Sequence, residues 1–251
     1  MKAQPIYRVT IPDLAIPERE GGYAKGQEMR EQILHAALGI LIEEGYRAMT
    51  MRRVAASCAM KLGNLTYYYP TREDLVRDLL ESVIGAYESA FDVIAHKPGL
   101  SAEGRLEGLC RLILDDIRTK KTTRIFPELW ALANHDAFVS DRVYEMYERP
   151  LRFLIGVVRE MRPDLTDEQS RLLSLFVAAS MEGMTIFAGY QKPFVADMGR
   201  IENIAVRSFI DLVRTIRPEE FDRLIEPPRP PRAAAGKAGG EKAAPLAAQA
   251  S

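Results

Sequence analysis

The chain has 251 residues, of which 47% are hydrophobic and 27% are charged, and its formal net charge is −1. This composition is typical of a soluble globular protein with one or two domains and a well-buried core. The longest apolar runs fall far short of the ~20 residues that a membrane-spanning helix needs, and the N-terminus lacks an apolar secretion signal. We therefore expect a cytoplasmic protein that does not enter a membrane and whose Cys58 and Cys110 are reduced thiols.

Both ends of the chain lack the pattern of a folded core. Residues 1–26 contain Pro5, Pro12, Pro17 and the pair Gly21-Gly22 as helix breakers, and they show no helical period. This pattern predicts a flexible N-terminal arm that is disordered or ordered only on contact. Residues 227–251 are rich in Pro, Ala and Gly, which predicts a flexible tail.

Helical periodicity begins at about Glu28. Apolar residues recur on one stripe of a predicted helix over residues 28–44, and Gly45 is a typical C-terminal stop. The next stretch, residues 50–69 (TMRRVAASCAMKLGNLTYYY), predicts two short helices joined by a tight turn. The Thr50 hydroxyl can cap the first of these helices, because it can accept a hydrogen bond from an orphan amide of the first turn.

The second helix of this pair, at about residues 61–67, has an inward and an outward side. Helical spacing turns Leu62, Leu65 and Tyr69 inward. The outward set is Lys61, Asn64, Tyr67 and Tyr68. Residues 45–72 contain no acidic residue. Their basic residues are Arg47, Arg52, Arg53, Lys61 and Arg72. In a chain of net charge −1, this local imbalance indicates a phosphate-facing surface.

The rest of the chain also reads as helical. Thr71 and Asp74 form a capping-box pattern that opens a helix over 71–95, and another helix begins near Ser101. We expect Pro127, Pro150 and Pro163 to divide the middle of the chain into separate helices. A second capping box opens a helix over 166–190, and the last long helix spans 196–216 and stops at Pro218. Because no segment alternates convincingly with a period of two, we predict an all-α fold.

At these residues the sequence resembles the TetR-type family of bacterial helix-turn-helix transcriptional regulators. The resemblance runs from about Gln27 to Tyr87 and rests on the helix ending in EEGYRAMT, the pair over 50–69, and YYYPTREDL. It implies a DNA-binding domain over 27–87 and a helical domain for effector binding and dimerisation over 88–226. It also implies a repressor dimer that leaves a palindromic operator in double-stranded DNA when a small molecule binds. An activator or a ligand-independent regulator is the alternative.

The candidate DNA contacts combine residue chemistry with the family pattern. Asn64 is the residue type that pairs bidentately with adenine, Lys61 can reach a phosphate or a guanine edge, and Gly63 lets the backbone approach DNA closely. The family pattern implies that the outward tyrosines contact the DNA backbone and that Arg72 grips it. Two arginines also start the first helix, where cations are unfavourable and a phosphate would compensate them. The expected contact set is Thr50, Arg52, Arg53, Lys61, Leu62, Gly63, Asn64, Thr66, Tyr67, Tyr68 and Arg72.

The region from Leu100 to Ile216 supplies enough aromatic and methionine residues to line a cavity between helices. Its candidate ligand-orienting groups are Arg124, Asn134, His135 and Glu182, and the sequence does not choose among them. Apolar residues on two faces of the last two long helices, together with the family pattern, predict a homodimer. A helical enzyme is a competing class, but the chain lacks an HExxH motif, a Walker loop and a paired-cysteine cluster, so we expect no catalytic residue, cofactor or metal. A helical adaptor that does not bind DNA is disfavoured by the basic, acid-free segment.

Overall fold

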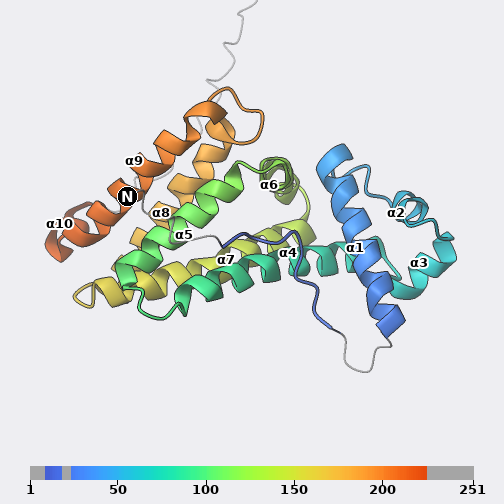
Figure 1. Ribbon diagram of the computed structural model, residues 1–251, viewed down its shortest axis with the longest axis horizontal. Coiled ribbons are helices and arrows are strands. Elements are labelled where there is room, and N and C mark those ends of the chain that lie inside the picture. The colour runs from blue at the N-terminus through green and yellow to red at the C-terminus, as the bar shows by residue number, and fades with distance from the viewer. Residues whose placement is uncertain (1–8, 19–23, 225–251) are drawn as a thin grey trace, which may run out of the picture. The chain divides into compact units, whose positions relative to one another are not determined.

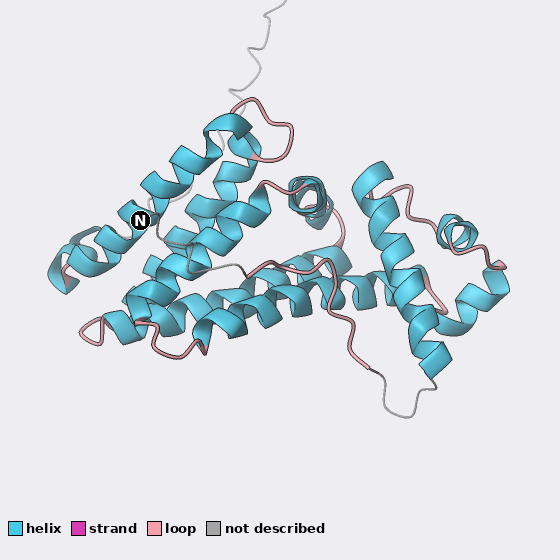
Figure 2. Ribbon diagram, viewed as in Figure 1, coloured by secondary structure: helices cyan, strands magenta, loops and turns pink. Residues whose placement is uncertain are grey.

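The computed structural model describes residues 9–18 and 24–224, and every regular element in those ranges is a helix (Figures 1 and 2). The predicted tail over 227–251 and residues 1–8 and 19–23 lie outside the described residues. The elements are α1 (Ala24–Glu44), α2 (Met51–Ser57), α3 (Leu62–Tyr68), α4 (Arg72–Ala95), α5 (Ala102–Ile117), α6 (Lys120–Ala133), α7 (Ala137–Met161), α8 (Asp167–Ala188), η1 (Val195–Asp197), α9 (Met198–Thr215) and α10 (Pro218–Leu224). The predicted all-α fold is confirmed.

Side-chain caps start several of these helices where the sequence places them. The Thr50 hydroxyl accepts a hydrogen bond from the Arg53 amide, at 3.2 Å. Capping boxes open α4 at Thr71 and α8 at Thr166, as predicted. Each cap satisfies an amide that the first helical turn leaves without a partner, so these boundaries are fixed by residues only three positions apart.

Two of the expected proline boundaries are wrong. Pro127 lies inside α6 and Pro150 lies inside α7, so neither proline ends its helix. The actual boundaries are set by N-cap side chains at Thr119 and Asp136. A proline inside a helix removes one backbone hydrogen bond, and tertiary packing of the surrounding turns offsets that loss here. Pro163, in contrast, does follow the end of α7.

The helices α1, α2 and α3 form a head, and α4 continues from it into a helical body made of the later helices (Figure 1). Within the body, α7 packs against α4, α5, α6 and α8. The described residues up to Ile216 form one compact unit, and α10 belongs to the segment beyond it. The predicted domain boundary at residue 87 falls in the middle of α4, which runs through it without a break.

The turn between α2 and α3 is a Schellman motif built without glycine. Ala59 adopts a left-handed conformation with φ of 51°. The Met60 amide donates to the Ala55 carbonyl at 3.0 Å, and the Ala59 amide donates to the Ala56 carbonyl at 3.1 Å. This tight turn fixes the direction in which α3 leaves α2, although alanine is strained at a position that usually favours glycine.

Residues 9–18, which belong to the arm predicted over 1–26, contact the body. They run as an extended segment along α4 and α6. The Ala15 amide donates to the Ser82 carbonyl at 2.8 Å, and Lys121 Nζ donates to the Pro12 carbonyl at 3.2 Å. In addition, α1 already begins at Ala24. The sequence could not reveal these contacts, because the partners lie more than sixty residues away along the chain.

The end of α1 is fastened to α6 of the body. Glu128 accepts a hydrogen bond from the Tyr46 amide at 2.6 Å, and Arg124 donates to the Ile42 carbonyl at 3.1 Å. Gly45 has φ of 89°, and a Cβ atom there would lie 2.9 Å from Glu128 Oε1. Glycine is therefore required at this stop both by the backbone conformation and by the close approach of α6.

Candidate functional site

The outward face of α3 presents a continuous row of exposed residues. Tyr67 is 83% exposed, whereas Leu65 and Tyr69 on the opposite face are almost fully buried. The other exposed members of this face are Lys61, Gly63, Asn64 and Thr66. Tyr68 is half-buried, and its ring meets the Tyr67 ring edge to face at a centroid distance of 5.3 Å. The structure thus brings these predicted contact residues onto one accessible surface.

The sequence predicts Leu62 both as an inward residue and as a DNA contact, and its position agrees only with the second prediction. Helical spacing predicts it inward, but the side chain is 38% exposed at the first position of α3. The first residue of a short helix extends past the edge of the core that Leu65 fills, so Leu62 stays on the outward surface. This position agrees with its inclusion among the candidate contacts.

A buried hydrogen-bond chain holds the end of α3. The Tyr69 hydroxyl donates to Asp78 Oδ2 of α4 at 2.6 Å, and Arg30 Nη2 of α1 donates to the same oxygen at 2.8 Å. Burial and the adjacent Asp78 carboxylate raise the pKa of Tyr69 well above its ordinary value. The end of α3 is therefore tied to α1 and α4 directly beneath the outward face.

The arginines of α2 differ in their surroundings. Arg52 is exposed, whereas Arg53 Nη2 pairs with Glu44 Oε1 of α1 at 2.6 Å. The Arg53 cation at the start of α2 is thus compensated within the protein, and it does not require a phosphate for that purpose. Because both partners are about half exposed, the pair contributes little stability and can open when an anion approaches.

Arg72, which the family pattern places at the DNA backbone, is built into the head by hydrogen bonds to the loop before α2. Its Nε donates to the Met49 carbonyl at 2.9 Å, and its Nη2 donates to the Tyr46 carbonyl at 2.7 Å. The guanidinium also lies over the Tyr46 ring, 4.1 Å from the centroid. These contacts fix the loop between α1 and α2, so the role that the structure gives Arg72 is to position the loop that carries the Thr50 cap.

A surface hollow beside α3 includes residues that the sequence could not place there. Met29 of α1 and Met60 of the turn line it together with residues of the outward face, which are Gly63, Asn64, Tyr67 and Tyr68. No sequence pattern marks Met29, because the approach of the start of α1 to α3 is a tertiary contact. Cys58 lies below this turn, and burial raises the pKa of its thiol, as expected for a structural cysteine.

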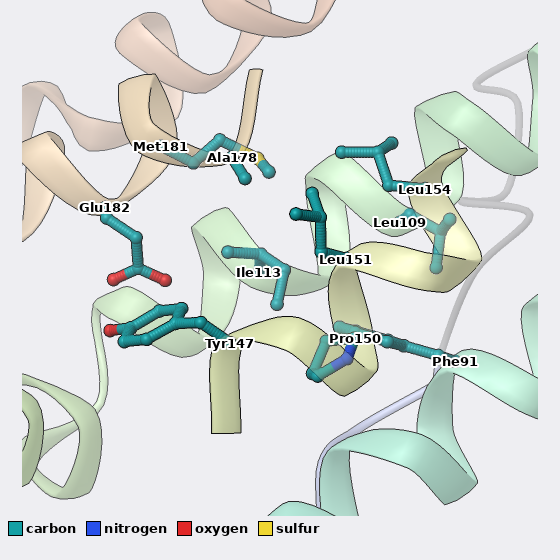
Figure 3. Close-up of a pocket in the computed structure, with 10 residues that line it drawn as sticks. All are labelled: Phe91, Leu109, Ile113, Tyr147, Pro150, Leu151, Leu154, Ala178, Met181 and Glu182. Atoms are coloured by element: carbon teal, nitrogen blue, oxygen red, sulfur yellow. The ribbon is translucent and has the colours of Figure 1, made fainter. Parts of the chain in front are cut away.

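A second candidate site lies inside the body, where two hollows of about 70 and 50 Å³ adjoin. They share the lining residues Phe91, Ile113, Tyr147, Pro150 and Glu182. Figure 3 shows Glu182 and Tyr147 together at one end, and apolar side chains around the rest. The walls come from α4, α5, α6, α7 and α8.

The polar groups of this cavity are linked through their hydroxyls. Trp130 Nε1 donates to the Tyr147 hydroxyl at 2.8 Å, and Tyr147 and Glu182 lie together at one end of the cavity (Figure 3). Burial raises the pKa of Glu182 to about 7, the Tyr147 hydrogen bond opposes this shift, and the Asp116 charge adds to it. Asp116 accepts hydrogen bonds from Tyr87 and Thr122, both at 2.5 Å.

Of the four candidate ligand-orienting groups in the sequence, Glu182 lines the cavity. Arg124 is engaged with the end of α1, and Asn134 and His135 lie at the end of α6, away from the cavity lining. The aromatic residues around Glu182 come from three helices and are far apart in the sequence. Only the packing of the bundle shows which of them meet.

Two family models match the chain. Residues 33–79 match the model of bacterial regulatory proteins of the tetR family, and residues 102–214 match that of the C-terminal domain of BetI-type transcriptional repressors. A helix-turn-helix transcriptional regulator from the dhlA 5′ region of Xanthobacter autotrophicus is 30% identical over 193 residues, which cover 75% of this chain and 90% of the relative. The chain belongs to the TetR family.

A second relative and several solved structures are similar at lower identity. The regulator PksA of Bacillus subtilis is 22% identical over 163 residues, covering 63% of this chain and 80% of PksA. A putative TetR-family regulator from Mesorhizobium loti superimposes with a TM-score of 0.62 at 16% identity, over 76% of this chain and 98% of that one. A Saccharomonospora viridis regulator in complex with choline gives a TM-score of 0.60 at 16% identity, over 75% and 96%. These structures show the same fold.

Proposed function

We propose that this TetR-family regulator is a cytoplasmic repressor that binds a palindromic operator as a homodimer and releases it when a small molecule enters the body. The observation that carries this proposal is the outward face of α3, where Lys61, Asn64 and Tyr67 are exposed above a buried Leu65 and Tyr69. A helix of this kind enters the major groove, where side chains at its surface reach base edges and phosphates. The two relatives named above are helix-turn-helix transcriptional regulators, which supports the same class for this chain.

The exposed residues of the outward face suit several roles in DNA binding. Asn64 is the candidate for reading a base, because its amide can donate to and accept from adenine. Lys61 and Tyr67 are candidates for phosphate contacts, which give affinity without sequence preference. Arg52 joins them from α2, and Arg53 joins when its pair with Glu44 opens. The exposed Leu62 is available for apolar contact with a thymine methyl.

A second copy of the chain is the expected partner of an apolar surface on α8 and α9. The exposed stripe on α8 consists of Phe176, Ala179, Gly183 and Phe187, which recur at helical spacing. Ile204 of α9 is 67% exposed. Among the described helices, α8 alone is long and apolar enough to cross a membrane. Its length and composition are weak evidence for a membrane span, because a helix with one buried face and one dimer-forming face has the same apolar character. An isologous dimer interface would cover this stripe.

The helix α4 can transmit ligand binding to DNA. Asp78 near its start holds Tyr69 at the end of α3, and Tyr87 and Phe91 further along line the cavity. Arg149 of α7 ties the middle of α4 to the body through Glu81 and Glu88, at 2.8 and 2.6 Å. A ligand that binds one position of α4 better than another would therefore shift the spacing of the two heads in the dimer.

Selection of bound fragments from genomic DNA tests the proposal and yields the operator. With the selected operator, Asn64→Ala should relax preference at one or two base pairs, losing roughly 1–3 kcal/mol of discrimination. Lys61→Ala should instead weaken binding to all sequences and flatten the dependence on salt. Asn134→Ala, an asparagine on the body, is the matched control and should change neither. A protein that prefers no selected sequence over bulk DNA would contradict the proposal.

A further inference from the structure

The two acids on the cavity wall differ in how they are compensated. Asp116 accepts two hydroxyl hydrogen bonds, and Lys121 Nζ lies 3.9 Å from its Oδ1. Lys121 also lies over the Tyr87 ring and donates to the Pro12 carbonyl. Its ammonium group therefore interacts with these groups as well as with Asp116. Glu182 interacts with the Tyr147 hydroxyl and, among the described residues, forms no ion pair. Its carboxyl group is therefore the uncompensated acid of the cavity.

Aromatic rings surround the same space. Tyr87 meets Phe91 and Phe126 edge to face at centroid distances of 6.3 and 5.8 Å, and Phe126 lies 6.2 Å from Tyr147. All four rings line the cavity. Ring faces attract cations, most strongly where water is excluded. The described residues that line either hollow include no lysine, arginine or histidine.

We propose that this cavity binds a small organic cation, a quaternary ammonium or a protonated amine with short apolar substituents, whose charge is met by Glu182 and by the rings of Phe91 and Tyr147. The apolar substituents would contact Ile113, Pro150 and Met181. An anion is disfavoured, because two acids already face the space. The volumes of about 70 and 50 Å³ favour a small ligand over a drug-sized one. The inference rests on the proposed function only in treating the cavity as the effector site.

Proton release should accompany binding. Burial raises the pKa of Glu182 to about 7, and a bound cation would favour the ionised carboxylate and lower that pKa again. The charged and titratable groups that face Glu182 are Tyr147 from α7 and Asp116 from α5, with Tyr87 of α4 and Lys121 of α6 behind Asp116. Affinity for the cation should therefore increase as the pH rises from 6 to 8 through the pKa of about 7.

The test compares a cation with its neutral isostere. Choline and 3,3-dimethylbutan-1-ol have the same shape and differ in the charge of one central atom. The full chain carries a single tryptophan, Trp130, whose indole bonds the Tyr147 hydroxyl, so its fluorescence reports on the cavity. Titrations at pH 8 would use both compounds, and a panel of tetramethylammonium and benzyltrimethylammonium would vary the cation size.

We expect at least one cation of the panel to bind, and choline to bind at least tenfold more tightly than its isostere. Glu182→Gln should remove this preference and leave binding of the isostere within about twofold, whereas damage to the cavity would weaken both compounds. Glu148→Gln, an exposed glutamate on α7, is the matched control. Equal affinity for choline and the isostere, an unchanged preference in Glu182→Gln, or no binding by any cation would overturn the proposal. DNA binding is measured separately without ligand, so a failure here leaves operator recognition intact.

Discussion

Replacing Glu182 by Gln should change how the stability of this regulator depends on pH. Burial raises the pKa of Glu182 from an ordinary value of 4.5 to about 7 in the folded protein. Because the folded-state pKa is the higher one, the folded protein binds more protons than the unfolded chain between these values. The stability from this group is therefore fully present below pH 4.5 and is lost as the pH rises through about 7.

The magnitude follows from the shift. One pKa unit corresponds to about 1.4 kcal/mol, so a shift from 4.5 to about 7 corresponds to roughly 3 kcal/mol. Glutamine stays neutral at every pH and does not incur this loss. The free energy of unfolding of Glu182→Gln, minus that of the wild type, should thus rise by up to roughly 3 kcal/mol between pH 4.5 and pH 8. For a chain of this size, that amounts to a gain of roughly 6–12 °C in Tm.

Urea unfolding followed by circular dichroism at several pH values would measure the difference. All variants should be compared at one protein concentration, because the proposed dimerisation would make apparent stability depend on concentration. Glu148→Gln supplies the control for removing an exposed glutamate from the same body. If the difference between Glu182→Gln and wild type is independent of pH from 4.5 to 8, the carboxyl group is not held in the environment described here, and the reasoning is wrong.

Five further substitutions, two of which serve as comparisons, probe the dimer and the backbone. Phe187→Glu, at a side chain that is 59% exposed on α8, should shift the light-scattering mass toward the monomer, whereas Tyr144→Glu, at 68% exposure on α7, should not; a dimer in both variants would place the interface elsewhere. Gly45→Ala should lower the free energy of unfolding by roughly 1–3 kcal/mol, because alanine is strained at φ of 89° and its Cβ would meet Glu128. Gly39→Ala, in the middle of α1 with no atom near the added Cβ, should instead stabilise by roughly 0.5–1 kcal/mol, and similar effects at the two glycines would refute the argument. Ala59→Gly should stabilise by up to about 1 kcal/mol in urea unfolding, since release of left-handed strain outweighs the added entropy of the unfolded chain; a clear loss of stability would show that Ala59 is unstrained.

Features that depend on neighbours within one or two helical turns follow from the amino-acid sequence. The caps at Thr50, Thr71 and Thr166 need a hydroxyl and an amide three residues apart, so local residues specify their positions. The same holds for the division of α3 into a buried face with Leu65 and an exposed face with Asn64, because helical period fixes which residues share a side. The family, the all-α fold and most of the outward face are therefore predictable from the residues alone.

The use of charged and polar side chains depends instead on tertiary structure. Arg72 and Arg53 have the residue type and location of phosphate contacts, but Arg72 binds two loop carbonyls and Arg53 pairs with Glu44. These partners come from the region of α1 and the loop after it, and no local pattern specifies that they meet. The selection of Glu182 from four candidate groups likewise required the positions of five helices.

Long-range packing also overrides two local rules. Pro127 and Pro150 are helix breakers by their covalent structure, yet α6 and α7 continue through them, because packing against other helices offsets a lost hydrogen bond. The prolines of residues 9–18 prevent a helix, but Ala15 and Pro12 still bond the body through their backbone groups. Backbone amides and carbonyls are the same in every sequence, so a segment that binds through them leaves no side-chain pattern to read, and only the folded structure reveals its place.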